Sequence, residues 1–178
     1  MNDRYIAFDR DGTLIKHIPY LHKVEEVELF NDTIKSIKIL KRNGFKFFLH
    51  TNQSGISRKY FSIDDVIKCN NKLITMIGLG NDLFEDICIA EDYPRKKNSY
   101  RKPSPKFGLE IIDKYKIKKE NLFYVGDSVS DLQTGNNIGC HSYGVNTGLV
   151  DLNPSYDNRK KFDISKSLFE VVNKIIKE

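Results

Sequence analysis

Two acidic residues, Asp9 and Asp11, stand one residue apart at the end of the first apolar run of the chain, and Gly12 follows them. Two neighbouring carboxylates repel each other unless a cation lies between them. A third acid, Asp127, follows a later apolar run in the stretch GDSVSD. A few carboxylates with room for water are the ligands that Mg²⁺ prefers, whereas zinc favours His and Cys. These residues therefore predict a Mg²⁺ site.

Two further residues suit a phosphate group beside that ion. Thr51 can hydrogen-bond an oxyanion, the turn at Gly12 offers N–H groups, and Lys102 supplies a fixed positive charge. Phosphoryl transfer needs an in-line nucleophile, an acid for the leaving oxygen and positive charge around the equatorial oxygens. We expect Asp9 to attack phosphorus and form an aspartyl-phosphate. Asp11 would protonate the leaving alkoxide and later take a proton from water.

The same residues also have purely structural explanations. The first two acids and Gly12 could form an ordinary turn. Thr51 could cap a helix, and Lys102 could be a solvated lysine before a proline. Asp127 and Ser128 could cap the helix that follows them. The combination of four such clusters at one edge of a sheet makes a binding site the better interpretation.

The strands and helices that would position these residues alternate along the chain. Runs rich in aromatic and β-branched residues predict five strands, at residues 5–8, 45–50, 86–90, 122–125 and 142–145. Apolar residues at helical spacing predict helices within residues 34–40, 66–77, 107–115 and 168–176. This alternation predicts an α/β fold with a doubly wound, mainly parallel sheet. Ligands of such sheets bind beyond the carboxyl ends of the strands.

The ends of the predicted helices carry recognisable signals. Ser62 precedes Asp65 by three residues, Ser104 precedes Pro105, and Gly44 closes the first helix. Residues 13–30 are too many for a simple strand-to-helix turn, so they are predicted to form a flap beside the site.

The whole chain reads as one soluble domain, residues 1–178, with 39% hydrophobic and 30% charged residues. No apolar run approaches the ~20 residues of a membrane span, and the N terminus lacks the regions of a signal peptide. We therefore expect a cytoplasmic monomer with no membrane partner. Cys69, Cys88 and Cys140 are odd in number and widely spaced, which favours reduced, half-buried packing residues.

The motifs together resemble those of the haloacid dehalogenase-like superfamily. FDRDGTLI looks like its DxDGT signature, TNQSGISR like its threonine motif, RKPSP like its lysine motif and GDSVSD like its acidic motif. Within the superfamily, the chain is similar to the branch of histidinol-phosphate phosphatase and D-glycero-D-manno-heptose 1,7-bisphosphate phosphatase. The resemblance covers residues 5–148 and implies a Rossmann-like fold without a large cap domain.

The resemblance also implies a role for each motif residue. It makes Asp9 the nucleophile and a metal ligand, and Asp127 a second metal ligand. Asp11 becomes the acid/base and binds the metal through its backbone, while Thr51 and Lys102 stabilise the phosphate. Residues implied to contact substrate are Gly12, His17, Ile18, Pro19, Tyr20, Asn52, Gln53, Ser54 and Arg101.

Three features depart from or extend that pattern. Both named groups commonly carry a structural zinc loop before the lysine motif, but residues 88–103 hold one cysteine and no histidine, so we predict no zinc. Ser128 stands where heptose phosphatases tend to have lysine. In place of that lysine, the loop at residues 93–100 could contact the distal end of the substrate. Asp131 matches a carboxylate that supports the lysine or the metal.

The leading hypothesis is a Mg²⁺-dependent phosphatase for a small sugar phosphate such as D-glycero-D-manno-heptose 1,7-bisphosphate. Histidinol-phosphate phosphatase and polynucleotide 3′-phosphatase are the alternatives. The net charge of +5 lies largely in residues 95–102 and 159–161, and nucleic-acid binding usually needs a basic face, so no such partner is expected. Residues 95–97, Asp151, Asp157 and residues 159–161 are interpreted as surface.

A phospho-acceptor regulatory domain also combines clustered acids, a threonine and a lysine on a doubly wound sheet. Its acceptor aspartate follows a later strand than Asp9 does. Such a switch would retain the aspartyl-phosphate, whereas an enzyme with Asp11 should hydrolyse it quickly.

Overall fold

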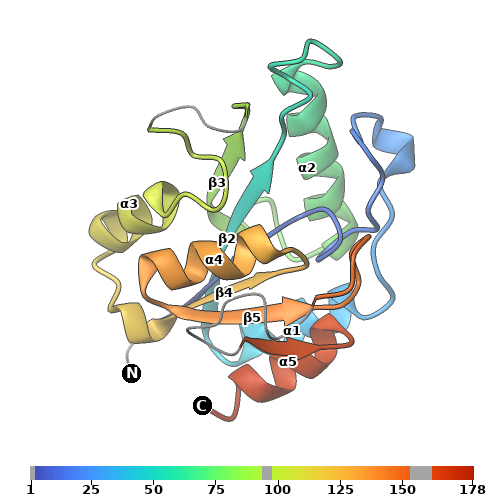
Figure 1. The fold of residues 1–178 in the computed structure, drawn as a ribbon. Coiled ribbons are helices and arrows are strands. Elements are labelled where there is room, and N and C mark those ends of the chain that lie inside the picture. The colour runs from blue at the N-terminus through green and yellow to red at the C-terminus, as the bar shows by residue number, and fades with distance from the viewer. Residues whose placement is uncertain (1–2, 94–97, 153–161) are drawn as a thin grey trace.

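The structure, a computed structural model, describes residues 3–93, 98–152 and 162–178. Its centre is a six-stranded sheet in the order β3-β2-β1-β4-β5-β6, and each neighbouring pair of strands runs parallel (Figure 1). The strands are β1 (Arg4–Phe8), β2 (Phe45–Asn52), β3 (Phe84–Ala90), β4 (Leu122–Gly126), β5 (His141–Val145) and β6 (Asp163–Ser165). The predicted doubly wound, mainly parallel α/β fold is confirmed, and β6 is an additional strand.

Helices cover both faces of the sheet (Figure 1). They are α1 (Thr33–Arg42), α2 (Ile63–Ile77), α3 (Lys106–Tyr115), α4 (Val129–Ile138) and α5 (Leu168–Ile175). Ile37 of α1, Cys69 of α2 and Val172 of α5 pack in the core on one face. Ile111 of α3 and Ile138 of α4 pack in the core on the other. The central strands must therefore be apolar on both sides, which explains their nearly continuous hydrophobic runs.

Successive side chains of β1 point to opposite faces of the sheet, as in any strand. Ile6 and Phe8 enter the core shared with α1, α2 and α5, whereas Tyr5 and Ala7 enter the core shared with α3 and α4. Asp9, directly after Phe8, is thereby fixed at the carboxyl end of a buried strand.

Two of the three predicted helix ends are confirmed. The Ser62 hydroxyl accepts a hydrogen bond from the Asp65 N–H, and an Asp65 oxygen accepts one from the Ser62 N–H, so the capping box is complete. Gly44 follows the end of α1 with a φ of +78°, a conformation that glycine adopts without strain. The third signal is displaced by one residue. Pro105, rather than Ser104, is the N-cap of α3, with φ −79° and ψ −1°. The Ser104 hydroxyl still accepts a hydrogen bond of 3.3 Å from the N–H of Lys106, the first residue of the helix.

The segment between β1 and α1 forms the predicted flap. The Arg10 carbonyl accepts hydrogen bonds from the N–H groups of Leu14 (3.0 Å) and Ile15 (3.1 Å), which turns the chain sharply after β1. Ile15 then forms a bridge with Leu29, and the short 3-10 helix η1 (Val24–Glu26) packs against α2. Within the described residues this flap and the loops beside it take the place of an inserted cap domain.

The remaining expectations about the surface and the cysteines have separate outcomes. Cys69, Cys88 and Cys140 are all buried, more so than expected. Asp151 is exposed as predicted, whereas residues 95–97, Asp157 and residues 159–161 lie outside the described residues. None of the helices in the described part of the chain is long and apolar enough to span a membrane.

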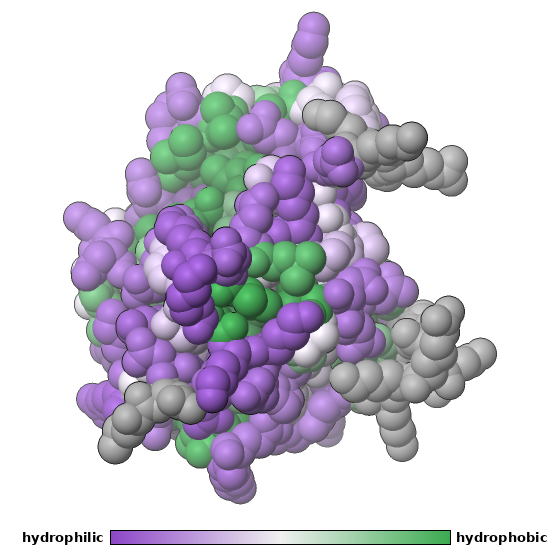
Figure 2. Space-filling view, turned by 90° about the vertical axis from the view of Figure 1, so that its left-hand side faces the viewer, coloured by the Kyte–Doolittle hydropathy of each residue, from purple (hydrophilic) through white to green (hydrophobic). Residues whose placement is uncertain are grey.

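Apolar side chains also reach the surface on the side of the molecule where α3 lies. Figure 2 faces this side and shows apolar groups among hydrophilic ones. Leu109 of α3 and Ile87 of the edge strand β3 are exposed apolar residues of these two elements.

Candidate active site

The predicted site residues meet where the strand order reverses, between β1 and β4. The two strand ends are adjacent, because the Asp9 N–H donates a hydrogen bond of 2.9 Å to the Val125 carbonyl. Asp9 follows β1 and Asp127 follows β4. Thr51 is the second-last residue of β2 and still pairs with β3, because β2 extends two residues further than the sequence predicts. Such a reversal point at the carboxyl edge is where doubly wound sheets bind ligands.

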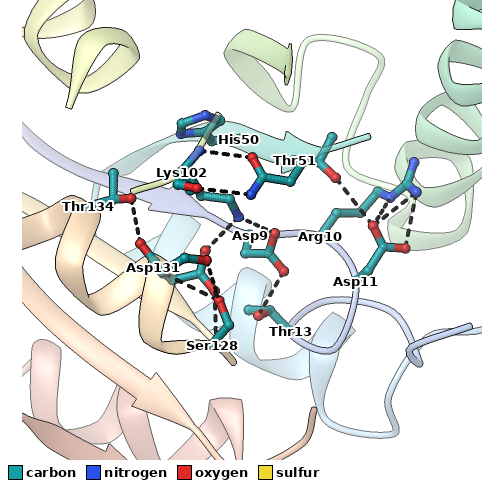
Figure 3. A network of polar contacts seen from close by, with 12 residues as sticks. Asp9, Arg10, Asp11, Thr13, His50, Thr51, Lys102, Ser128, Asp131 and Thr134 are labelled. Atoms are coloured by element: carbon teal, nitrogen blue, oxygen red, sulfur yellow. Dashed lines mark hydrogen bonds and ion pairs between the residues drawn. The ribbon is translucent and has the colours of Figure 1, made fainter. Parts of the chain in front are cut away.

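Three carboxylates and one lysine form the centre of the site. Asp9, Asp127 and Asp131 each offer an oxygen, and these oxygens lie within 4.8 Å of one another. Lys102 forms a buried ion pair with Asp9 and a second one of 2.5 Å with Asp131 (Figure 3). Asp131 is further held at the start of α4, where it accepts hydrogen bonds from the Ser128 N–H (3.0 Å) and hydroxyl (2.6 Å). Asp131 therefore supports the lysine, as the resemblance implied.

The other two carboxylates of this cluster are less well compensated. Burial raises the pKa of Asp127 to about 9, and the charges of Asp9 and Asp131 add to the effect. Burial also raises the pKa of Asp9 to about 7, although Lys102 opposes this shift. Asp127 has no ion pair with any described residue. A buried set of oxygen donors with surplus negative charge is the environment that a hard cation such as Mg²⁺ stabilises.

Two glycines allow Asp127 to occupy this position. A Cβ at Gly12 would lie 2.2 Å from an Asp127 oxygen, and a Cβ at Gly148 would lie 2.0 Å from the same oxygen. Gly12 has a φ of +91°, so it also permits a backbone turn that other residues rarely adopt. The turns after β1 and β5 thus close directly on the carboxylate.

The Asp11 carboxylate lies apart from this acidic cluster, which corrects the expectation that a cation lies between the side chains of Asp9 and Asp11. It accepts hydrogen bonds from Arg10 Nε (3.0 Å) and Nη2 (3.1 Å), from the Thr51 hydroxyl (3.3 Å) and from Gln53 Nε2 (3.0 Å). Figure 3 shows Asp11 on the opposite side of Asp9 from Asp131. The Asp11 side chain therefore lies outside the group of carboxylates that could bind a metal ion.

A cleft of about 220 Å³ opens beside Asp11, and most of the predicted substrate contacts line it. The lining residues are Asp11, His17, Ile18, Pro19, Tyr20, Leu21, Asn52, Gln53, Ser54 and Gly55. His17 also lines a neighbouring hollow of about 440 Å³ that contains Asp127. The flap and the end of β2 thus bring seven of the nine predicted substrate contacts together in this cleft. The other two lie elsewhere: Gly12 lies against Asp127, and Arg101 lies on the adjacent loop.

A protein family described as "Polynucleotide kinase 3 phosphatase" matches residues 4–169 of the chain. The chain belongs to this family. The predicted haloacid dehalogenase-like superfamily and the predicted class of enzyme, a phosphatase, are thereby confirmed.

Individual relatives agree with this assignment. The chain is 33% identical over 137 residues to the D-glycero-beta-D-manno-heptose-1,7-bisphosphate 7-phosphatase of Pasteurella multocida, covering 73% of this chain and 74% of that protein. It is 32% identical over 181 residues to the D-glycero-alpha-D-manno-heptose-1,7-bisphosphate 7-phosphatase of Photorhabdus laumondii, covering 93% of each. A crystal structure of D,D-heptose 1,7-bisphosphate phosphatase from B. bronchiseptica, complexed with magnesium and phosphate, has the same fold. Its TM-score is 0.85 at 22% identity, covering 98% of each chain.

At the rim of the phosphatase site, two arginines have no acidic partner among the described residues. Arg101 lies with Lys102 in a hollow of about 700 Å³, and its Nη1 is buried without a hydrogen-bond partner among the described residues. Burial, and then the charge of nearby Arg58, lower the pKa of Arg101. Arg58 itself lies over the ring of Tyr93, 5.2 Å from the centroid. Two close guanidinium groups, with no counter-charge in the described part of the chain, indicate a place for an anion.

A buried histidine that the sequence did not single out ties the Lys102 loop to the sheet. His50 Nε2 donates to the Tyr100 carbonyl (2.8 Å), and the Tyr124 hydroxyl donates to His50 Nδ1 (2.6 Å). Burial, and then the charge of Lys102, lower the pKa of His50 to about 3, which keeps the ring neutral. Burial alone would also lower the pKa of Lys102, but Asp131 and Asp9 raise it above its ordinary value. In the sequence, His50 only continues the apolar run that predicts β2, so its hydrogen-bond partners can be recognised only in the structure.

Proposed function

We propose that this chain is a Mg²⁺-dependent phosphomonoester hydrolase that acts through an aspartyl-phosphate on Asp9, with D-glycero-D-manno-heptose 1,7-bisphosphate as substrate. The observation that carries the proposal is the buried Asp9 carboxylate at the reversal point of the sheet, ion-paired with Lys102 and clustered with Asp127. The names of the relatives from P. multocida and P. laumondii support the heptose bisphosphate as substrate. We also infer that residues 1–178 form a single phosphatase domain, because the six strands share one sheet.

The first half of the reaction uses the groups around Asp9. One Asp9 oxygen is held by Lys102 and the other accepts a hydrogen bond from the Thr13 hydroxyl (3.4 Å), so the carboxylate is fixed for attack on phosphorus. Asp9 and Asp127, with the Asp11 backbone carbonyl, would hold Mg²⁺, which when bound supplies positive charge beside the phosphate oxygens. Lys102 and Thr51 stabilise the charge that the transferring group carries.

The proton transfers fall to Asp11. It lines the cleft in which the leaving alcohol would lie, so it can protonate the alkoxide as the P–O bond breaks. It then takes a proton from water, which attacks the aspartyl-phosphate and releases inorganic phosphate with Asp9 restored. Environments that separate the two carboxylates allow one to act as nucleophile and the other as acid.

A bisphosphate suits this site better than a monophosphate. One phosphate would lie at Asp9, and the second would find Arg58 and Arg101, whose guanidinium groups have no acidic partner in the described residues. The cleft of about 220 Å³ beside Asp11 accommodates a small sugar rather than a large substrate.

One observation favours a second candidate, a polynucleotide 3′-phosphatase. Three tyrosines at the rim are 45–57% exposed, namely Tyr20, Tyr60 and Tyr93. Tyr20 and Tyr60 contact each other edge to face at 4.9 Å, and Arg58 lies against Tyr93. Exposed aromatic rings beside arginines are typical of surfaces on which unpaired bases stack.

Phosphate release across a panel of substrates distinguishes these functions. The panel holds heptose 1,7-bisphosphates, heptose monophosphates, histidinol phosphate and 3′-phosphorylated oligonucleotides, each with Mg²⁺ and with EDTA. We expect the highest kcat/KM on a heptose bisphosphate and no turnover with EDTA. Activity only on oligonucleotides, falling steeply with salt, would establish the second candidate, and activity restored by Zn²⁺ but not Mg²⁺ would overturn the metal assignment.

The variant Arg101→Gln tests the anion site within the same panel. Losing one charge-assisted contact should raise KM for the bisphosphate by about tenfold or more while leaving KM for the monophosphate nearly unchanged. Arg42→Gln, an exposed arginine at the end of α1, is the matched control.

A further inference from the structure

Arg10, the residue between the two acids of the DRDGT motif, is completely buried. Its Nε and Nη2 groups donate to the two oxygens of Asp11, at 3.0 Å and 3.1 Å, so the guanidinium and the carboxylate face each other as a fork. Its Nη1 group donates to Asn70 Oδ1 at 2.9 Å. Figure 3 shows the guanidinium beside the Asp11 carboxylate, on the side away from Lys102.

Asn70 is itself an unusual residue for its position. It lies on the buried face of α2, next to Cys69 and one turn before Leu73 and Ile74, which belong to the core. A buried amide needs a hydrogen-bond partner, and here that partner is Arg10. The contact therefore fastens the loop after β1 to a helix that packs on the sheet.

The nearby acidic cluster explains why Asp11 needs such a partner. A cation held by Asp9 and Asp127 would attract any flexible carboxylate two residues away along the chain. Arg10 offers the Asp11 carboxylate a competing positive charge on the other side, and Thr51 and Gln53 add donors from β2 and the residue after it. The carboxylate is thereby kept at the wall of the cleft.

We propose that Arg10, anchored by Asn70, is a positioning residue that holds the Asp11 carboxylate in the cleft for proton transfer and away from the cation site. This inference rests on the proposed function, because it concerns how Asp11 performs its part of the reaction. It gives the two acids of the motif separate duties: Asp9 lies in the acidic cluster and Asp11 lies in the cleft.

The backbone of Arg10 has a different part, which substitution of the side chain leaves in place. Its carbonyl accepts the hydrogen bonds from Leu14 and Ile15 that turn the chain into the flap. Variants that change only the side chain therefore test the fork to Asp11 without removing these bonds.

Leaving groups of different basicity isolate the step that depends on Asp11. The leaving group of p-nitrophenyl phosphate departs without a proton, whereas a sugar alkoxide requires one. In Arg10→Lys, which keeps the charge but loses the fork, and in Asn70→Leu, we expect a rapid burst of one p-nitrophenolate per site followed by slow turnover. On the sugar phosphate the same variants should lose about tenfold to 100-fold in kcat with little change in KM and without a burst.

Two reference proteins complete the experiment. Asp11→Asn should give the same pattern more strongly, and Asn71→Ala, an exposed neighbour on α2, should behave as the native protein. If Arg10→Lys does not fold, Asn70→Leu carries the test, since it removes the anchor without changing a charge. Native-like kinetics in both variants, or an equal loss on both substrates without a burst, would overturn the assignment of Arg10. Absence of phosphatase activity in the native protein would instead overturn the proposed function itself.

Discussion

Asp127 is the member of the acidic cluster that forms no ion pair with a described residue, because Lys102 pairs with Asp9 and Asp131 instead. Its pKa rises from 3.8 to about 9, mainly through burial. A carboxyl group with a raised pKa keeps its proton in the folded state at pH values where the unfolded chain has lost it. Its contribution to stability is therefore present at low pH and lost as the pH rises toward that value.

Mg²⁺ and protons should compete for this carboxylate. We expect this carboxyl group to lower the stability of the metal-free protein as the pH rises from about 4 to about 9, between its unfolded and folded pKa values. The apparent Mg²⁺ affinity should tighten by up to about tenfold per pH unit over the same range, since a proton leaves as the ion binds. Calorimetric titration and thermal unfolding at several pH values measure both effects. Asp127→Asn should abolish Mg²⁺ binding and stabilise the metal-free protein at the alkaline end. An Mg²⁺ affinity that does not change with pH would contradict this.

At the residue scale, the acids and the lysine could be predicted because their types and spacing have few other uses in combination. Thr51, Lys102 and Asp127 lie at the same sheet edge as Asp9, as predicted. Arg10 could not be predicted, since an arginine between two acids reads as a solvated side chain. Only the fold shows that Asn70 and Asp11 accept hydrogen bonds from its guanidinium group.

At the scale of elements, the turn after β5 decides how closely Asp127 can be approached. Gly148 lies against this carboxylate, where a Cβ would be 2.0 Å from an oxygen, and its φ is outside the left-handed region. An alanine there strains the side-chain contact rather than the backbone.

Gly148→Ala should therefore retain the fold and disturb the cation site. We expect the Mg²⁺ concentration for half-maximal activity to rise about tenfold or more, because the displaced Asp127 loses its place as a ligand. Phosphate release titrated with Mg²⁺ measures this, with Val150→Ala, an exposed neighbour, as the control. Unchanged Mg²⁺ activation in Gly148→Ala would mean that Asp127 does not bind the ion.

Elements with strong patterns were predictable, and those with weak ones were not. Strand β6 has three residues and only one large apolar side chain, so no period of two can emerge. Helix α4 could be foreseen only through its cap at Ser128, because its sequence VSDLQTGNNI contains few apolar residues. Its buried face relies on Leu132 and Ile138, with Thr134 and Gly135 packed closely between them.

At the scale of the whole molecule, the order of the strands creates the site. The sequence predicts that strands and helices alternate, but it does not give the order of the strands in the sheet. That order reverses between β1 and β4, because β2 and β3 are added on one side of β1 and the later strands on the other. That winding brings the ends of β1, β2 and β4 together with the Lys102 loop. The expectations of a monomer, a cytoplasmic location and no structural zinc stay predictions.

The most direct measurement of the central claim is the rate of phosphate release from D-glycero-D-manno-heptose 1,7-bisphosphate, with saturating Mg²⁺, by the native protein and by Asp9→Asn. The substitution is nearly isosteric, so circular dichroism should show an unchanged fold. We expect turnover by the native protein and a rate at the level of buffer for Asp9→Asn, because the amide cannot attack phosphorus. Substantial turnover by Asp9→Asn would contradict the aspartyl-phosphate mechanism.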